Sequence, residues 1–263
     1  RKGMRLQTDP TVIYGLGELH LRSILERMNS QYKCEVDTRP PRIPYRETIT
    51  AQAEGFHRHK KQTGGAGQFG EVSLRVEPLP RGGGFEFVDA TKGGVIPHQF
   101  MPAVRKGVEQ VLATGAVAGF PMQDVRVVVH DGKHHPVDSK EVAFVSAGRK
   151  AFLDAVAKAR PIVLEPVVSV EVICPEANTG DIAGDLSSRR GQVTGTSGLG
   201  PGVLAVSGLA PLVELDGYSA RLKSVTGGHG SFTMALSHYE PAAPGLQQQL
   251  TADYDKRRKH DED

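Results

Sequence analysis

The second half of the sequence repeats one order of elements, and this repeat restricts the fold more than any other feature does. Residues 166–175 alternate apolar and polar side chains as a strand does, residues 176–191 predict a helix closed by a glycine, and residues 192–198 predict another strand. The same order follows at residues 203–211, 211–224 and 231–239. Two consecutive strand–helix–strand units are typical of a four-stranded antiparallel sheet backed by two helices. We therefore expect an α+β domain that ends near Glu240.

A glycine-rich segment at residues 60–72, KKQTGGAGQFGEV, contains the spacing G-x-G-x-x-G, which brings backbone N–H groups close to a nucleotide phosphate. Dinucleotide-binding domains need a helix after this spacing, but residues 72–76 alternate as a strand does. Protein kinases need a lysine strand, an H-R-D loop and a D-F-G triplet, which the sequence lacks. We therefore predict a hairpin tip between residues 47–60 and 69–77. It is either a flexible crown that meets nucleic acid or an ordinary glycine-rich connection.

The composition suits a soluble protein with two domains or parts of three, since the 263 residues are 38% apolar and 24% charged. The formal net charge is only +2, so contact with nucleic acid would depend on local clusters of positive residues. Such clusters occur at residues 58–61, 133–135, 189–190 and 256–260. A run of charge is more often a solvated face than a binding site.

Two isolated cysteines, Cys34 and Cys174, show no C-x-x-C spacing. This favours a reducing compartment and argues against a disulfide framework or a zinc site. No signal peptide or membrane span is visible, because the longest apolar run, near residues 125–129, is too short to cross a bilayer. We expect a cytoplasmic protein with no membrane partner.

Helices are also predicted in the first half of the chain. One spans residues 97–113, and a second begins where Asp138 and Glu141 form a capping-box pattern, directly after a turn that holds two histidines. A further helix at residues 15–31 precedes a short strand at residues 33–37. One helix and one or two strands cannot bury a core alone. Residues 1–38 are therefore expected to be the tail of a domain that begins before this sequence.

Several phrases, taken in order, are more specific than any one of these patterns. They are GLGELHL, PYRETI, KKQTGGAGQFGEV, GGVIP, HHPVDSKEVAF, LEPVVSVEV, TGDIAGDLSSRRG and GYSARLKSVTGGHGSFTM. Together they cover roughly residues 11–239 and resemble the C-terminal half of bacterial elongation factor G. TGGHGSFTM and SHYE are more similar to the paralogue branch called elongation factor G2 or G-like.

The resemblance implies a multidomain α+β fold. Residues 1–40 would be the incomplete third, ferredoxin-like domain, and residues 41–163 a ribosomal-protein-S5-like βαβ fourth domain with tip loops at residues 63–68 and 131–137. Residues 164–240 would be a ferredoxin-like βαββαβ fifth domain, and residues 241–263 a C-terminal tail. From their polar and charged composition, residues 254–263 are expected to be a frayed helix end. The GTPase domain, with its GTP and Mg²⁺, would precede residue 1. No cofactor or catalytic centre is then expected here.

The resemblance also implies partners and contact residues. The factor would act as a cytoplasmic monomer that meets ribosomal RNA of both subunits, the tRNA–mRNA pair in the decoding region, and the stalk base. The implied tip contacts are Lys60, Lys61, Gly64, Gly65, Gln68, Lys133, His134 and His135. The implied contacts of the fifth domain are Arg189, Arg190 and Lys223, although two arginines at a helix C-terminus equally suit charge compensation there.

This tip departs from the family pattern at two positions, because His134 replaces a usual tyrosine and Pro136 an acidic residue. Three other readings stay open at this stage. The chain could be a stand-alone RNA-binding module, an ATP-using enzyme, or part of a ribosomal protection protein. Whether the parent factor serves translocation or ribosome recycling is also open.

Overall fold

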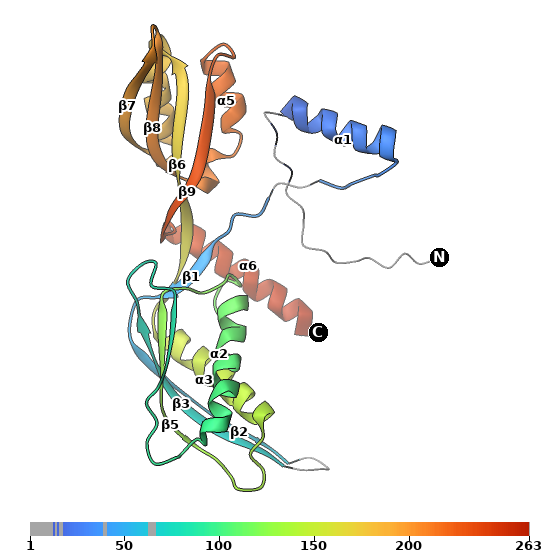
Figure 1. Ribbon diagram of the computed structural model, residues 1–263, viewed down its shortest axis with the longest axis vertical. Coiled ribbons are helices and arrows are strands. Elements are labelled where there is room, and N and C mark those ends of the chain that lie inside the picture. The colour runs from blue at the N-terminus through green and yellow to red at the C-terminus, as the bar shows by residue number, and fades with distance from the viewer. Residues whose placement is uncertain (1–12, 14, 16–17, 39–40, 63–66, 263) are drawn as a thin grey trace.

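The computed structural model describes residues 13, 15, 18–38, 41–62 and 67–262. In these residues two α+β domains are joined end to end, and helix α1 (Glu18–Tyr32) lies apart from both (Figure 1). We call the domain with the glycine-rich hairpin the tip domain and the other the C-terminal domain. The helix predicted near residues 15–31 is confirmed as α1. The strand predicted at residues 33–37 is wrong, since no described strand lies beside this segment to pair with it.

The tip domain is a four-stranded sheet covered by two helices. Its strands are β2 (Ala53–Lys61), β3 (Gln68–Pro78), β4 (Phe85–Asp89) and β5 (Val125–Lys133), in the order β2-β3-β5-β4. The neighbouring strands are antiparallel except for β4 and β5, which are parallel. The helices are α2 (Met101–Thr114), which follows the short η1 (His98–Phe100), and α3 (Glu141–Lys158).

The core of the tip domain lies between this sheet and its helices. Alternate residues of β3 are buried in one apolar cluster with Phe144 and Phe152 of α3, as the alternation in the sequence predicts. Strand β2 approaches α3 so closely that a Cβ on Gly55 would lie 2.1 Å from the carbonyl oxygen of Ala151. Glycine is therefore required at this contact.

The C-terminal domain has the predicted strand–helix–strand repeat. Its elements are β6 (Pro161–Pro175), η2 (Glu176–Asn178), α4 (Thr179–Ser188), β7 (Gln192–Gly200), β8 (Val203–Pro211), η3 (Leu212–Leu215), α5 (Tyr218–Val225) and β9 (Ser231–Pro241). The strand order is β9-β6-β8-β7, with every pair antiparallel. The expected ferredoxin-like arrangement is confirmed. The single helix predicted over residues 211–224 is wrong, because Gly217 takes a left-handed φ of 67° and separates η3 from α5.

The two domains are joined through a shared strand. Strand β1 (Arg46–Ile49) pairs with the first residues of β6, while the rest of β6 pairs with β8 and β9. The fully buried carboxylate of Glu47 accepts backbone N–H bonds of 2.7–3.0 Å from four residues of the loop between α2 and β5: Ala116, Val117, Ala118 and Phe120. These bonds satisfy a charge that would be costly to bury alone.

Helix α6 (Pro244–Glu262) packs over this joint (Figure 1). Leu246 and Leu250 lie against the small apolar cluster that contains Tyr45. The side chain of Tyr254 lies so close to Gly119 that a Cβ there would be 2.6 Å from its ring. The segment expected to fray is thus helical as far as Glu262. None of the described helices combines the length and the apolar character that a membrane span requires.

Candidate nucleic-acid interface

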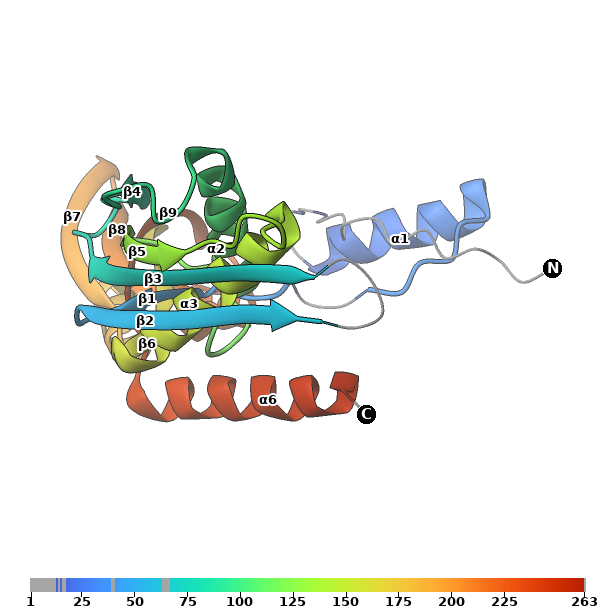
Figure 2. The ribbon, with the colours of Figure 1, turned by 90° about the horizontal axis from the view of Figure 1, so that it is seen from below.

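Strands β2 and β3 form a long antiparallel hairpin that projects past the helices of its domain (Figure 2). Lys60 pairs with Phe69 and Lys61 with Gln68, so the predicted hairpin is confirmed. Two predicted contact residues, Gly64 and Gly65, lie outside the described residues. A Cβ on Gly67, at the start of the returning side, would be 2.7 Å from the carboxylate of Asp138, so the hairpin lies directly against the neighbouring loop here.

The loop between β5 and α3 is bound to this hairpin by two hydrogen bonds, and a third closes the loop on itself. The hydroxyl oxygen of Ser139 accepts the backbone N–H of His135 at 2.8 Å and donates to the carbonyl of Phe69 at 3.1 Å. The backbone N–H of Phe69 in turn donates to the carbonyl of Asp138 at 2.9 Å. The two predicted tip loops therefore form one structural unit. We call residues 60–62, 67–69 and 133–139 the tip.

The imidazole of His135 has a defined orientation within the tip. Its Nδ1 accepts the backbone N–H groups of Val137 at 3.3 Å and Asp138 at 3.2 Å. A carboxylate oxygen of Asp138 lies 3.5 Å from the same nitrogen, which would suit a protonated ring. The two backbone donors are closer and need an unprotonated Nδ1, so we assign the ring proton to Nε2. The ring is 51% exposed, and its centre lies 6.2 Å from that of Phe69.

His134 is placed differently from its neighbour. Its Nδ1 lies 3.1 Å from the carbonyl oxygen of Val95, on the loop before α2, and the residue is half-buried. Both rings use Nδ1 within the domain, but the ring of His134 is half-buried, whereas that of His135 is 51% exposed. A role for His134 in binding stays a prediction.

The tip encloses a small cavity of about 170 Å³. Its lining residues are Lys60, Gln62, Gln68, Phe69, His135 and Asp138. An aromatic ring, two amides, a histidine and a lysine around one hollow can stack on a base or donate to phosphate and base oxygens. The cavity brings together Lys60, Gln68 and His135, which the resemblance implied as tip contacts. It adds Phe69 and Asp138, which the resemblance did not imply.

The lysines of the tip form no ion pair with any described carboxylate. These lysines, Lys60, Lys61 and Lys133, are exposed. Glu71, which is in register with Lys133 on β3, is instead paired with Arg58 of β2. The lysine ammonium groups are thus available to an anionic partner.

The capping box predicted at Asp138 is wrong. Helix α3 begins at Glu141, its N-cap is Lys140, and no side chain caps it. Asp138 and Ser139 are used for contacts between the two loops, so tertiary contacts outcompete the local capping pattern. Asp138 and Ser139 are adjacent in the sequence, but Phe69, which Ser139 contacts, lies 70 residues earlier. No local sequence pattern connects Ser139 with Phe69.

The arginines at the end of α4, unlike the lysines of the tip, are paired with carboxylates of their own domain. Arg190 binds both carboxylate oxygens of Glu165, at 2.8 and 2.9 Å, and one of Glu214 at 2.8 Å. These hydrogen bonds, the one to Glu165 above all, raise the pKa of Arg190 above its ordinary value. Arg190 also adopts a left-handed φ of 56° after α4, and Gly191 donates its N–H to the Leu186 carbonyl at 2.8 Å. The arginine, rather than the glycine, takes the left-handed position that ends the helix.

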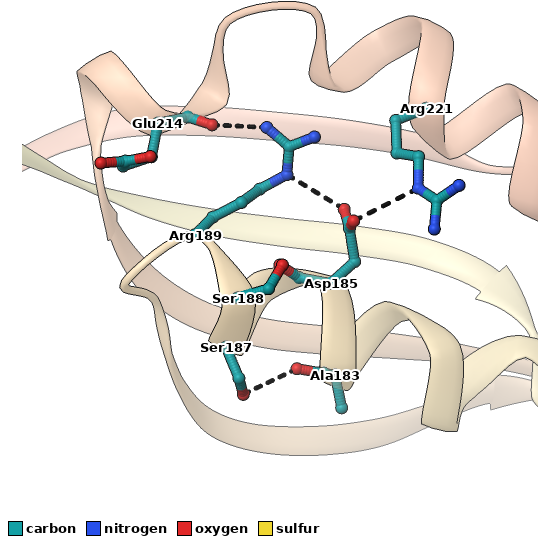
Figure 3. A network of polar contacts seen from close by, with 7 residues as sticks. All are labelled: Ala183, Asp185, Ser187, Ser188, Arg189, Glu214 and Arg221. Carbon is teal, nitrogen blue, oxygen red and sulfur yellow. Dashed lines mark hydrogen bonds and ion pairs between the residues drawn. The ribbon is translucent and has the colours of Figure 1, made fainter.

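Arg189 is held in the same way (Figure 3). It donates to the carboxylate of Asp185 at 3.1 Å and to the carbonyl of Glu214 at 2.5 Å. Its guanidinium lies over the buried ring of Tyr218, 5.3 Å from the centroid. Arg221 reaches the same Asp185 at 3.3 Å. Lys223, on α5, is exposed and has no ion pair among the described residues. The arginines thus link α4 to β6, η3 and α5.

The described residues contain no group of three or more side chains suited to hold a metal ion.

Two family models match the chain in succession. Residues 41–160 match elongation factor G domain IV, and residues 162–250 match the elongation factor G C-terminus. The chain thus contains two adjacent domains of the elongation factor G type.

Relatives agree with both matches. An elongation factor G-like protein of Thermotoga maritima is 45% identical over 244 residues, 93% of this chain and 36% of the relative. Elongation factor G of Aquifex pyrophilus is 45% identical over 250 residues, with 94% and 36% covered. A crystal structure of a protein from Thermus thermophilus superposes with a TM-score of 0.83 at 38% identity, covering 92% of this chain and 36% of that one. The chain belongs to the elongation factor G family, and it spans about a third of the length of these relatives.

Proposed function

We propose that this chain is the ribosome-binding C-terminal portion of a cytoplasmic translational GTPase of the elongation factor G type. The tip would enter the decoding region while tRNA and mRNA move or, in a G-like branch, while ribosomes are recycled. The observation that carries this proposal is one structural unit, at the end of a projecting hairpin, that presents Lys60, Lys61, Lys133 and His135.

The chemistry of the tip suits RNA of varied sequence. Lysine ammonium groups neutralise phosphates without reading bases, and their contribution depends on salt because counterions are released. The Nε2–H of His135 can donate to a phosphate or base oxygen, and the exposed parts of Phe69 and His135 can stack on an unpaired base. We place the binding sites for GTP and Mg²⁺ in the part of the parent factor that lies outside this chain's match to its relatives.

In the C-terminal domain the best candidate for a ribosomal contact is Lys223, which is exposed and unpaired in the described part of the chain. Contact through Arg189 and Arg190 stays a prediction, and their guanidinium groups already have partners within the domain. A partner at the stalk base would have to compete with these bonds. We therefore expect Lys223 to contribute more to binding than either arginine does.

Tethered cleavage of ribosomal RNA tests the placement of both domains. The exposed Cys34 is first replaced by serine, while the buried Cys174 is kept. A hydroxyl-radical-generating iron chelate is then attached at Gln62→Cys in one variant and at Lys223→Cys in another. We expect the first probe to cleave small-subunit RNA near the decoding region and the second to cleave large-subunit RNA at the stalk base. Cleavage at neither region, compared with the Cys34→Ser chain treated alike, would contradict the proposal.

A further inference from the structure

Among the described side chains of the tip, only that of Ser139 hydrogen-bonds both to its own loop and to the hairpin. Its hydroxyl group bonds to both loops at once, accepting from the backbone of His135 and donating to the backbone of Phe69. Its own backbone N–H also donates to the carbonyl of His135 at 3.2 Å. The residue is half-buried between the two loops, so its side chain is not itself presented to a partner.

We infer that Ser139 is a positioning residue that sets the donor face of His135 against the hairpin, and that RNA binding by the tip depends on it. The inference rests on the proposed function, because it concerns how the same tip is preorganised. In this arrangement Nε2 of His135 presents an N–H donor. Its partner would be a hydrogen-bond acceptor of RNA.

The geometry behind this inference has two steps. The Ser139 bonds close the loop over residues 135–139, which places the backbone N–H groups of Val137 and Asp138 on Nδ1 of His135. With Nδ1 occupied as an acceptor, the remaining proton is on Nε2. The bond from Ser139 to Phe69 then fixes this ring beside the hairpin, with the centres of the two rings 6.2 Å apart.

Removal of the hydroxyl should loosen the loop without opening the domain. A typical hydrogen bond contributes on the order of a factor of five to an equilibrium, so Ser139→Ala should weaken binding of the chain to vacant bacterial ribosomes by about threefold to tenfold. Ser139→Thr keeps the hydroxyl and should stay within about twofold of the wild type. Ser146→Ala, on α3, is the matched control because no hydrogen bond of its side chain is found in the described residues.

Two further readouts separate positioning from a general structural effect. Long-range proton–nitrogen NMR spectra of the chain, assigned by loss of the His135 signals in His135→Ala, should show the Nε2-protonated tautomer in the wild type. They should show a mixture of tautomers in Ser139→Ala. In a double-mutant cycle, Ser139→Ala should cost little more affinity once His135 is already alanine.

The outcomes decide between this inference and its failure. Wild-type affinity and a wild-type histidine spectrum in Ser139→Ala would overturn it, as would an equal loss of affinity in the His135→Ala background. A fall in melting temperature shared by Ser139→Ala and Ser139→Thr would assign the serine to the fold instead. If the wild-type chain bound no ribosomes, the proposed function would fail, while the histidine spectrum would still decide whether Ser139 positions the ring.

Discussion

The lysines of the tip and the arginines after α4 form similar clusters of positive charge in the sequence, yet their surroundings in the folded chain are opposite. Lys60, Lys61 and Lys133 are exposed and have no carboxylate partners in the described residues. Arg190 instead holds the buried carboxylate of Glu165. We therefore expect a cluster of charge to bind a partner only where the fold supplies no carboxylate of its own.

The difference also separates stability from binding. Charges that are already paired contribute to the free energy of unfolding, and an RNA partner would have to displace existing bonds to use them. Charges without partners contribute little to stability and keep their full attraction for phosphate. Each prediction below tests one side of this division.

The largest expected effect on stability is that of Arg190→Ala. It leaves the carboxylate of Glu165, which is 4% exposed, without its bidentate partner. Removing one member of a buried ion pair costs about 3–5 kcal/mol, but Arg190 is 40% exposed and water can enter, so we expect a loss of about 2 kcal/mol. Urea denaturation measures this loss. Lys223→Ala, on the same domain, is the control and should change the free energy of unfolding by less than about 0.5 kcal/mol.

At alkaline pH an effect of similar size is expected at Tyr218, the buried ring beneath Arg189. Burial raises the pKa of Tyr218 to about 12 from an ordinary value of 10.0. Between these pH values the unfolded chain has released the phenolic proton and the folded chain has kept it. Stability that is fully present below pH 10 is therefore lost on the way to pH 12, by about 1.4 kcal/mol per pH unit.

Tyr218→Phe isolates this contribution. The buried hydroxyl has no hydrogen-bond partner in the described residues, so the variant should differ from the wild type by less than about 1 kcal/mol at pH 7. Above pH 10 the variant should become the more stable of the two, as followed by thermal unfolding at several pH values. Parallel curves for both proteins across pH 10–12 would show that Tyr218 titrates as a solvated residue does.

A smaller effect is expected from backbone geometry at the end of α4. Arg190 holds a left-handed φ of 56°, which costs a residue with a Cβ about 1 kcal/mol and costs glycine almost nothing. Arg190→Gly should therefore be more stable than Arg190→Ala by about 1 kcal/mol, although both lose the ion pairs. Equal stability of the two variants would mean that the backbone leaves this conformation once the arginine is removed.

Prediction from the sequence succeeded where the signal was periodic. Strand patterns predicted β3 and the four strands of the C-terminal domain, and helical patterns predicted α2, α3 and α4 to within a few residues, but no pattern predicted β4. It failed where long-range contacts decide the local geometry. Asp138 looked like a helix cap and is part of the contact between the tip loops, and Gly217 divides a helix that an apolar stripe had suggested was continuous.

The candidate site was only partly predictable for the same reason. The lysines and His135 followed from resemblance to the family, whereas Phe69 and Ser139 became visible only when β3 and the loop before α3 were brought together. No pattern in the sequence distinguished the paired arginines from the unpaired lysines. Their carboxylate partners, Glu165 and Glu214, are 25 and 24 residues away from Arg190 along the chain.

The most direct test of this division is the salt dependence of ribosome binding, measured together with stability. Lys60, Lys61 and Lys133 are changed together to glutamine, and the control changes Lys106, Lys150 and Lys256, which are exposed on helices. We expect the tip variant to bind vacant ribosomes more weakly and to flatten the slope of log affinity against log salt by roughly two to three, at about 0.7–0.9 for each phosphate contact. Its free energy of unfolding should change by less than about 0.5 kcal/mol. Unchanged affinity and slope, or a large loss of stability, would contradict the claim that the tip lysines are free to bind RNA.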